Sequence, residues 1–447
     1  MTDYADILHR VRNRAKSAFV KNVLLLMSGT TLAQVISISA APLLLRIYDP
    51  AAFGIYGAFA SITSIFGVIS TLEYDQAIML PRTEKRAANL LALSITSVST
   101  VALLAAVIMW LFGKNIASLL GTPSLVRFLK LVPISILVTG MYETLKIWST
   151  RRKHFRNISA SQGFKGVAGN SAQYLAGLEG FGPLGLIAGY IIGDLVSILI
   201  LLSNLIKKDA PCIVRSISFS RIRKVAREYS DFPVYSGTQS LLSSVSQNLP
   251  MLLLAHYFGV AVLGYYALAL RVIQVPVNIV LTSTKQVFYQ KACEVHNSGG
   301  SDLKLFIRTT AAMFGLALVP TVALIIFAPK IFAFALGVRW LNAGVYARWL
   351  VVWLCINFIN FPAYVYAQIY RKQHVLLIQD ICLLVFRSLA LIIGGIYFNA
   401  LTAVIAYSIV GLTFNIAIIL WALCFLRSRS IEANCDSQIN RLRFGES

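Results

Sequence analysis

Residues 87–112 read AANLLALSITSVSTVALLAAVIMWLF, a stretch of 26 residues without one charged side chain. At about 1.5 Å per residue, a helix of this length is longer than the roughly 30 Å hydrocarbon core of a bilayer. A helix on the surface of a soluble core needs a strongly polar face. This stretch has no charged residue to form one, so it predicts a helix that crosses a membrane.

The composition extends this prediction to the whole chain. Of 447 residues, 57% are hydrophobic and 13% are charged, with a mean hydropathy of +0.72. Soluble domains have about 45–50% apolar and about 25% charged residues, so a soluble or disordered chain is excluded. The net charge of +22 could suit a nucleic-acid partner. The basic residues, however, lie between apolar segments, which is typical of loops that face an anionic leaflet, so we expect no nucleic-acid partner.

Twelve segments have the length and apolarity of membrane spans, and the fifth is the weakest because glycines and polar residues dilute it. With the N-terminus placed in the cytoplasm, 29 of the 40 basic residues fall on the inside and five on the outside, as the positive-inside rule requires. We therefore predict an all-α polytopic membrane protein with both termini in the cytoplasm. The segments are 22–45, 53–78, 87–112, 125–148, 158–178, 184–206, 234–256, 261–288, 305–327, 345–370, 375–397 and 402–426.

The chain ends and the cysteines complete this picture. Residues 1–21 carry charges throughout, which predicts an amphipathic helix on the inner leaflet and not a signal peptide. The six cysteines lie in predicted spans or cytoplasmic segments, and their spacing matches no zinc site. We expect neither a metal site nor a disulfide framework. Residues 427–447 are predicted to form a cytoplasmic tail.

Three short motifs recur in the same order in the two halves of the chain, at nearly constant offset, which indicates duplication. The pairs are Ser28-Gly29-Thr30 with Ser236-Gly237-Thr238, Pro42-Leu43-Leu44-Leu45 with Pro250-Met251-Leu252-Leu253, and Gly54-Ile55-Tyr56-Gly57 with Gly264-Tyr265-Tyr266-Ala267.

An even number of predicted spans separates the two copies, so both should have the same orientation in the membrane. We predict two six-helix lobes, 22–206 and 234–426, related by a pseudo-twofold axis along the membrane normal. The basic stretch 207–233 would be the cytoplasmic linker between them. Pro42 and Pro250 occupy matching positions and are candidate hinges. Two facing lobes enclose a cavity, the geometry of alternating access.

Charged residues in the middle of spans indicate the sign of that cavity. Such a charge costs roughly 2.5–3.5 kcal/mol at the bilayer centre, so it should face protein or water. The middle of the spans holds one acidic residue, Asp194, and three basic residues, Arg271, Arg387 and Lys165. Surplus positive charge predicts a site for a phosphate or another anionic head group, because arginine can bind two of its oxygens. The alternative is that Lys165 or Arg271 pairs with Asp194.

Amide side chains lie at about the same depth. They donate and accept hydrogen bonds at once, which suits sugar hydroxyls. The alternative is that they join helices to one another. These residues are Gln34, Gln247, Asn248, Gln274, Asn278, Asn357 and Asn360.

A second group of charges lies near the predicted membrane surfaces and could couple transport to ions or act as gates. Near the cytoplasmic face, Glu143 and Lys146 are spaced to pair on one helix, and Glu73 and Asp75 could pair with arginines in the following loop. At the outer face, Arg46 and Asp49 flank a tyrosine as a candidate external gate. The candidates for coupling or gating are Glu73, Asp75, Glu143, Lys146, Asp194, Arg46 and Asp49.

Two regions carry a resemblance to a known family. The first is Leu72-Glu73-Tyr74-Asp75-Gln76-Ala77-Ile78-Met79-Leu80-Pro81 with the basic loop that follows it. The second comprises Glu228–Pro233, Ser246–Pro250, Phe258-Gly259, Gly264–Tyr266 and Gln286–Gln290. Both resemble the Wzx-type polysaccharide and O-antigen flippases of the multidrug/oligosaccharidyl-lipid/polysaccharide exporter superfamily. The family has a basic residue before the tyrosine of the first motif, where this chain has Glu73.

The resemblance implies a non-enzymatic flippase for undecaprenyl-diphosphate-linked oligosaccharide in the bacterial inner membrane. It implies that transport needs no cofactor and is driven by an H+ or Na+ gradient. It also implies that membrane lipids contact the protein. A polysaccharide polymerase and a chain-length regulator are candidate partners. Two alternatives stay open: a multidrug cation exporter of the same superfamily, which should have central carboxylates, and a membrane glycan polymerase or ligase.

Overall fold

The computed structural model describes residues 34–444 except 35, 38 and 299, and within this part of the chain every regular element is helical. The predicted helix at 1–21 and most of the first predicted span lie outside the described residues. The first span is described at its end, where the helix reaches Ile47.

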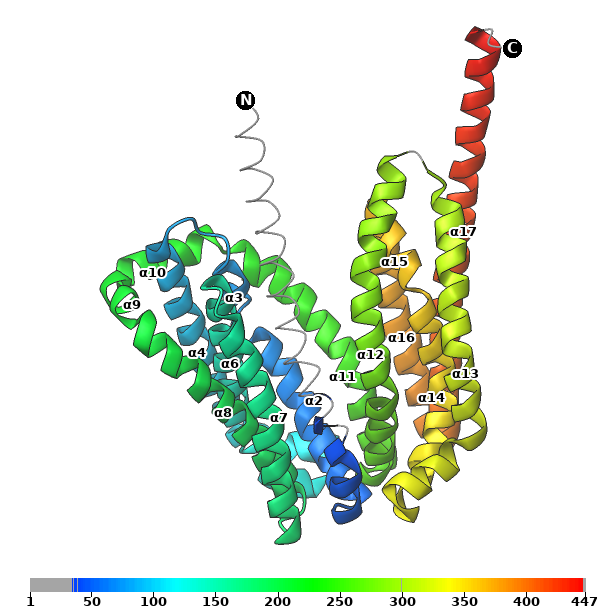
Figure 1. The fold of residues 1–447 in the computed structure, drawn as a ribbon. Helices are drawn as coiled ribbons and strands as arrows, with labels where there is room; N and C mark the ends of the chain where they lie inside the picture. Colours follow the sequence, from blue (N-terminus) through cyan, green and yellow to red (C-terminus); the bar gives the residue numbers. More distant parts are fainter. Residues whose placement is uncertain (1–33, 35, 38, 299, 445–447) are drawn as a thin grey trace. The chain divides into compact units, whose positions relative to one another are not determined.

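The first half contains five long helices before the predicted linker (Figure 1). They are α2 (Pro50–Ser70), α4 (Glu84–Leu119), α6 (Val132–Arg151), α7 (Phe155–Leu178) and α8 (Pro183–Lys208). Short elements connect them: α3 (Tyr74–Ala77), η1 (Pro123–Leu125) and α5 (Val126–Leu129).

The predicted linker is itself helical, and the second half repeats the pattern of long helices. The linker region holds α9 (Ala210–Ser216), α10 (Phe219–Glu228) and the π-turn η2 (Phe232–Ser236), and α11 (Gly237–Phe258) follows. The remaining elements are α12 (Val260–Asn297), α13 (Asp302–Leu336), η3 (Val338–Trp340), α14 (Leu341–Ile359), α15 (Phe361–Ile369), α16 (Gln373–Tyr397) and α17 (Ala400–Phe444).

Every predicted span after the first overlaps one of these helices or a pair of them. In the described part of the chain, eight helices are long and apolar enough to cross a membrane. A ninth is added if residues 123–129 and 132–151, which meet at a bend of 48°, form one broken span. The chain is therefore a multi-pass membrane protein. The more polar α7 and α11 are not among the eight, so the count of twelve spans stays a prediction.

The second predicted span, 53–78, ends earlier than its apolarity suggests. Helix α2 stops at Ser70, and Leu72 and Glu73 then adopt left-handed backbone conformations with φ of 50° and 58°. Such φ values are uncommon for residues other than glycine. They form a turn between α2 and α3 that a hydropathy pattern does not reveal.

The two halves also share local structure. In each, a glycine with positive φ, Gly121 or Gly337, lies within two residues after a long helix, and a short 3₁₀ turn follows. In each, a basic residue in the left-handed region, Lys153 or Arg371, lies two residues after a later helix, α6 or α15. The amide of each basic residue donates to a carbonyl three positions earlier, at 3.0 Å and 3.1 Å. This matching order agrees with the duplication that the sequence indicates.

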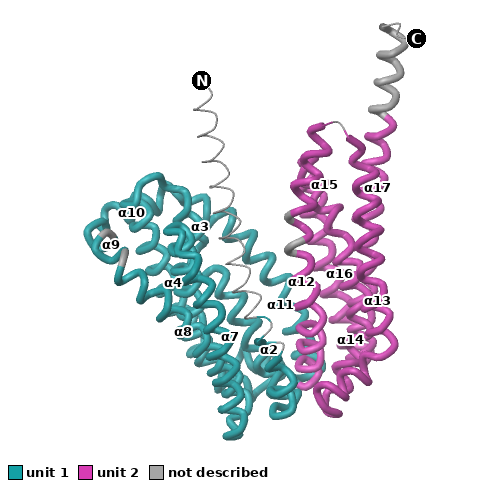
Figure 2. The backbone as a smooth tube through the Cα atoms, viewed as in Figure 1, with its two compact units in different colours: residues 1–260 teal, residues 261–447 magenta. Residues whose placement is uncertain are grey.

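The chain forms two compact units, residues 1–260 and 261–447 (Figure 2). Helix α11 belongs to the first unit, where it packs on α2, and Ser244 Oγ donates to the Ser64 carbonyl at 3.3 Å. The predicted lobes divide earlier, at the linker 207–233, and that division stays a prediction.

Glycines explain why the predicted fifth span is weakly apolar. Helices α7 and α8 pack so closely that a Cβ on Gly193 would lie 2.9 Å from the Lys165 carbonyl oxygen. A Cβ on Gly169 would lie 3.1 Å from the Gly189 carbonyl oxygen. Small residues allow such approach between membrane helices, where packing contributes much of the association free energy. The low hydropathy of α7 therefore reflects its packing against α8.

Candidate functional site

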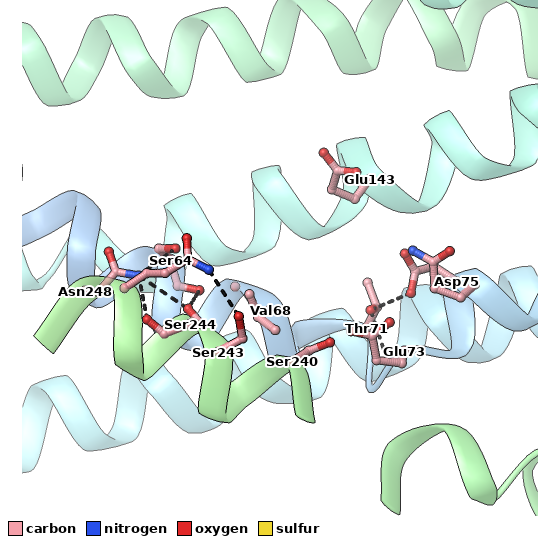
Figure 3. A pocket seen from close by; sticks show the side chains of 13 residues that line it. Ser64, Val68, Thr71, Glu73, Asp75, Glu143, Ser240, Ser243, Ser244 and Asn248 are labelled. Carbon is pink, nitrogen blue, oxygen red and sulfur yellow. Dashed lines mark hydrogen bonds between the residues drawn. The ribbon is translucent and has the colours of Figure 1, made fainter. Parts of the chain in front are cut away.

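A cavity of about 380 Å³ lies inside the first unit, between α2, α6 and α11 (Figure 3). Most of its side chains are polar, and we call it the polar pocket. Its lining residues are Ser64, Gly67, Val68, Thr71, Glu73, Asp75, Gln76, Glu143, Ser240, Ser243, Ser244, Gln247 and Asn248.

The left-handed turn after α2 brings two carboxylates to the polar pocket. The Glu73 amide donates to Thr71 Oγ1 at 3.2 Å, and the same hydroxyl donates to Asp75 Oδ1 at 2.7 Å. Asp75 lies beyond the end of α2 and is only 5% exposed. Burial raises the pKa of the Asp75 carboxyl above its ordinary value, although the bond from Thr71 opposes this rise.

Helix α11 supplies hydroxyl and amide groups from one face, because Ser240, Ser244, Gln247 and Asn248 are spaced three or four residues apart. Asn248 Nδ2 donates to the Ser244 carbonyl at 2.8 Å and to Ser64 Oγ at 3.3 Å. Two predicted polar residues, Gln247 and Asn248, therefore share one pocket with three predicted gating residues, Glu73, Asp75 and Glu143.

The polar pocket differs in sign from the cavity that the sequence predicts. Its lining includes the carboxylates of Glu73, Asp75 and Glu143 and no lysine or arginine. Glu143 pairs with Lys146 on the same helix, as the spacing allowed. Neither Glu73 nor Asp75 pairs with Arg86, which contacts Glu228 at 3.1 Å. The lining of the polar pocket therefore suits a bound cation or a neutral group that carries hydroxyls.

The predicted central base of the first unit is neutralised. Lys165 on α7 forms an ion pair with Asp194 on α8, and Asp194 also accepts a hydrogen bond from Thr139 Oγ1 at 2.9 Å. The Asp194 side chain is 1% exposed. Of the two alternatives for Lys165, pairing with Asp194 is the one observed.

Tyr142 connects this buried pair with the polar pocket. Its ring lies 4.7 Å from Lys165 Nζ and 5.4 Å from Lys146 Nζ, and Lys146 pairs with the pocket residue Glu143. A lysine near an aromatic face is attracted by the ring's quadrupole. A chain of contacts therefore joins two predicted coupling residues: Asp194 pairs with Lys165, both Lys165 and Lys146 lie near the Tyr142 ring, and Lys146 pairs with Glu143.

Arg387 in the second unit has a different environment. Its guanidinium carbon lies 4.1 Å from the ring centroid of Trp353 and 4.4 Å from that of Tyr407. Nε and Nη2 of Arg387 are buried and have no hydrogen-bond partner among the described residues. Buried guanidinium donors without acceptors are costly, which is the condition expected of a site that receives an anion. The sequence did not single out Trp353 or Tyr407, because aromatic residues are common throughout the spans.

The other predicted residues lie outside the polar pocket lining. Arg271 is exposed on α12, whereas the amide of Asn360 is buried and donates to Asn415, joining two helices. Gln34, Gln274 and Asn357 are half-buried, and Asn278 is exposed. The Asp49 carboxylate caps α2 by accepting from the Ala52 amide at 2.7 Å. Arg46 is exposed and has no ion pair with Asp49 within the described residues.

Of the two predicted hinges, Pro42 is half-buried in the helix that ends at Ile47, and Pro250 is buried inside α11. Their equivalence as hinges remains a prediction.

Comparison with solved structures identifies the fold. The lipid II flippase MurJ, in an inward closed conformation, matches with a TM-score of 0.71 at 16% identity, over 90% of this chain and 87% of that one. A multidrug resistance MATE family transporter of the MOP superfamily, in an inward-facing conformation, matches with a TM-score of 0.66 at 15% identity. That match covers 90% of this chain and 98% of the transporter. At these identities the likeness shows a shared fold.

Comparison of sequences identifies the family. The succinoglycan biosynthesis transport protein ExoT of Rhizobium meliloti (strain 1021) is 24% identical over 261 residues, which are 56% of this chain. They make up 48% of ExoT, so the match spans about half the length of that relative. The family described as "Polysaccharide biosynthesis protein" matches residues 43–345. Because that match covers well over half of the sequence, the chain belongs to the polysaccharide biosynthesis protein family.

Proposed function

We propose that this protein is a flippase that moves undecaprenyl-diphosphate-linked oligosaccharide across the bacterial inner membrane, from the cytoplasmic to the periplasmic face. The observation that carries the proposal is membership of the polysaccharide biosynthesis family on a fold shared with a lipid II flippase. Twelve spans in two lobes, with both termini in the cytoplasm, would provide alternating access.

The chemistry of Arg387 supports recognition of the diphosphate. Its buried Nε and Nη2 have no acceptor among the described residues, and a guanidinium can bind two phosphate oxygens with both groups. The rings of Trp353 and Tyr407 hold the guanidinium in place without neutralising its charge. Arg271 is the second basic residue that we assign to the head group, since its side chain is exposed on α12.

The polar pocket supports recognition of the sugars. Its lining combines serine and threonine hydroxyls, three amides and three carboxylates, and each can accept from or donate to sugar hydroxyls. A volume of about 380 Å³ is within the range of small-molecule sites. We assign energy coupling to the carboxylates that are connected through Tyr142, with H+ or Na+ as the ion.

A second function is favoured by one observation: the polar pocket holds three carboxylates and no basic residue. Export of organic cations would use such a pocket, and a MATE family multidrug resistance transporter has a similar fold. The two functions differ in the charge of the transported molecule, which allows one assay to separate them.

The experiment uses the full chain in proteoliposomes that contain an undecaprenyl-diphosphate oligosaccharide with a fluorescent label on its sugar. Dithionite added outside bleaches only label in the outer leaflet, which is about half of the label in vesicles without protein. With the protein and an imposed ion gradient, we expect dithionite to bleach most of the label. In parallel, the same vesicles are tested for gradient-driven movement of ethidium. Bleaching that never exceeds the protein-free value, together with ethidium movement, would replace the flippase by the cation exporter.

A further inference from the structure

We propose that α9 and α10 form a binding surface for anionic phospholipid head groups at the membrane surface. This surface, defined by residues 210–228, is independent of what the protein transports. Four observations on the described residues support it: its place next to a spanning helix, its rigid attachment, its exposed apolar side chains and its charge.

The place of the surface is fixed by α8. Residues 183–207 of α8 are long and apolar enough to cross a membrane, and α9 begins at Ala210, immediately after the connecting Asp209. One residue extends at most about 3.6 Å. Helix α9 therefore starts where α8 leaves the bilayer.

Asp209 and Asn89 attach the surface to the helical bundle. The buried Asp209 carboxylate accepts from Arg152 Nε at 2.8 Å and from Trp148 Nε1 at 3.1 Å. The Asn89 amide of α4 donates to the Ser216 carbonyl at 2.9 Å, and its oxygen accepts from the Ser218 amide at 3.1 Å. The connection between α9 and α10 is thus held by Asn89 and by Arg221, whose Nη1 donates to the Ser216 carbonyl at 3.0 Å.

Two apolar side chains of the surface point inward and three point outward. Ile213 and Val225 are buried in a cluster with residues of α3, α4 and α6. Val214 and Phe219, by contrast, are 73% and 83% exposed, and Ile217 is 41% exposed. Large apolar side chains held outward beside a membrane are typical of helices that enter the region between head groups and acyl chains.

The charge of the surface complements anionic lipid. Glu228 is the one acid in α9 and α10, and Arg86 neutralises it at 3.1 Å. Arginine binds phosphate oxygens in a bidentate geometry, and basic residues at a membrane surface are attracted to phosphatidylglycerol and similar lipids. The exposed basic residues are Arg215, Arg221, Arg223, Lys224 and Arg227.

The test places a tryptophan at the most exposed apolar position, Phe219→Trp, in the full chain. The protein is reconstituted into nanodiscs of phosphatidylcholine with 30% phosphatidylglycerol, and brominated forms of each lipid serve in turn as fluorescence quenchers. The chain has six native tryptophans, so the signal of the unsubstituted protein is subtracted. We expect brominated phosphatidylglycerol to quench the added tryptophan at least twice as strongly, per molecule, as brominated phosphatidylcholine.

The charge requirement is tested in the same background with the triple variant Arg215→Gln, Arg223→Gln, Lys224→Gln, which leaves the hydrogen bond from Arg221 to Ser216 in place. We expect it to lose the preference for the anionic quencher. A matched control, Lys114→Gln, Lys330→Gln, Arg339→Gln, changes three exposed basic residues elsewhere in the chain and should retain the preference. Size-exclusion profiles establish that each variant is folded.

Two results would overturn the proposal. If neither brominated lipid quenches the added tryptophan, the exposed apolar side chains do not enter the bilayer. If quenching is equal for the two lipids and unchanged in the triple variant, the surface contacts lipid without selecting its charge. If an acidic protein or nucleic acid binds residues 210–228 and neither lipid quenches the added tryptophan, that molecule and not lipid is the partner.

Discussion

Half-buried Lys165 on α7 and buried Asp194 on α8 form an ion pair beside Gly193, where a Cβ would lie 2.9 Å from the Lys165 carbonyl oxygen. Removing one partner of a buried pair leaves an uncompensated charge, which costs about 3–5 kcal/mol, whereas removing both can be nearly neutral. We expect Lys165→Met to unfold at a clearly lower temperature than the parent protein in detergent. The double variant Lys165→Met, Asp194→Leu should recover most of that loss.

The same variants separate structure from coupling. If the pair serves only to hold α7 against α8, the double variant should retain gradient-driven flipping. If Asp194 takes part in ion coupling, the double variant should be stable but should not respond to the gradient. A double variant that is less stable than the single one would contradict the pairing.

Arg387 should be sensitive to the shape of its side chain as well as to its charge. Lysine keeps the charge but lacks the planar guanidinium, which contacts the perpendicular rings of Trp353 and Tyr407 and can bind two oxygens. A hydrogen bond to a charged group contributes about 1.5–3 kcal/mol, so losing one weakens binding by about tenfold or more. We expect Arg387→Lys and Arg387→Gln both to reduce binding of the diphosphate lipid, measured by fluorescence titration in nanodiscs.

Arg339→Gln serves as the control, because Arg339 is an exposed basic residue outside the proposed site. The assignment of Arg387 to the head group is wrong if its two variants bind the lipid as tightly as the control does.

Asp75 should make stability depend on pH. Burial raises the pKa of its carboxyl in the folded protein, so between its ordinary value and the raised one the folded state holds a proton that the unfolded state has lost. Stability therefore falls as pH rises through this window. We expect the melting temperature of Asp75→Asn, relative to the unsubstituted protein, to increase over the same range. A difference that is constant with pH would show that Asp75 does not titrate in this way.

Much of the fold could be predicted from the sequence, because the apolar length of a span is a local property of the chain. The segment 184–206, for example, corresponds closely to α8. The break after Ser70 could not be predicted in this way, since Leu72 and Glu73 are ordinary residues whose backbone is set by neighbouring contacts. The helices within 207–233 were also missed, because their two buried apolar residues, Ile213 and Val225, are too few to form an apolar period.

The candidate site was less predictable for a related reason. The sequence gives the depth of a charged residue in the membrane but not its partners. Lys165 and Arg387 therefore looked equivalent, although Lys165 is paired with Asp194 and Arg387 contacts two aromatic rings. The acidic character of the polar pocket depends on bringing the end of α2 next to α6 and α11, which no local pattern contains.

The packing of α7 on α8 gives a last prediction, with a control that the same chain provides. A Cβ on Gly193 would lie 2.9 Å from the Lys165 carbonyl oxygen, whereas a Cβ on Gly315 of α13 would meet nothing within 4 Å. Overpacking costs about 1–3 kcal/mol, and alanine stabilises a helix interior by about 0.5–1 kcal/mol relative to glycine. We expect Gly193→Ala to lower the melting temperature in detergent and Gly315→Ala to leave it unchanged or slightly higher. Equal effects of the two substitutions would mean that α7 and α8 are less closely packed than described, because helix propensity alone would then account for both.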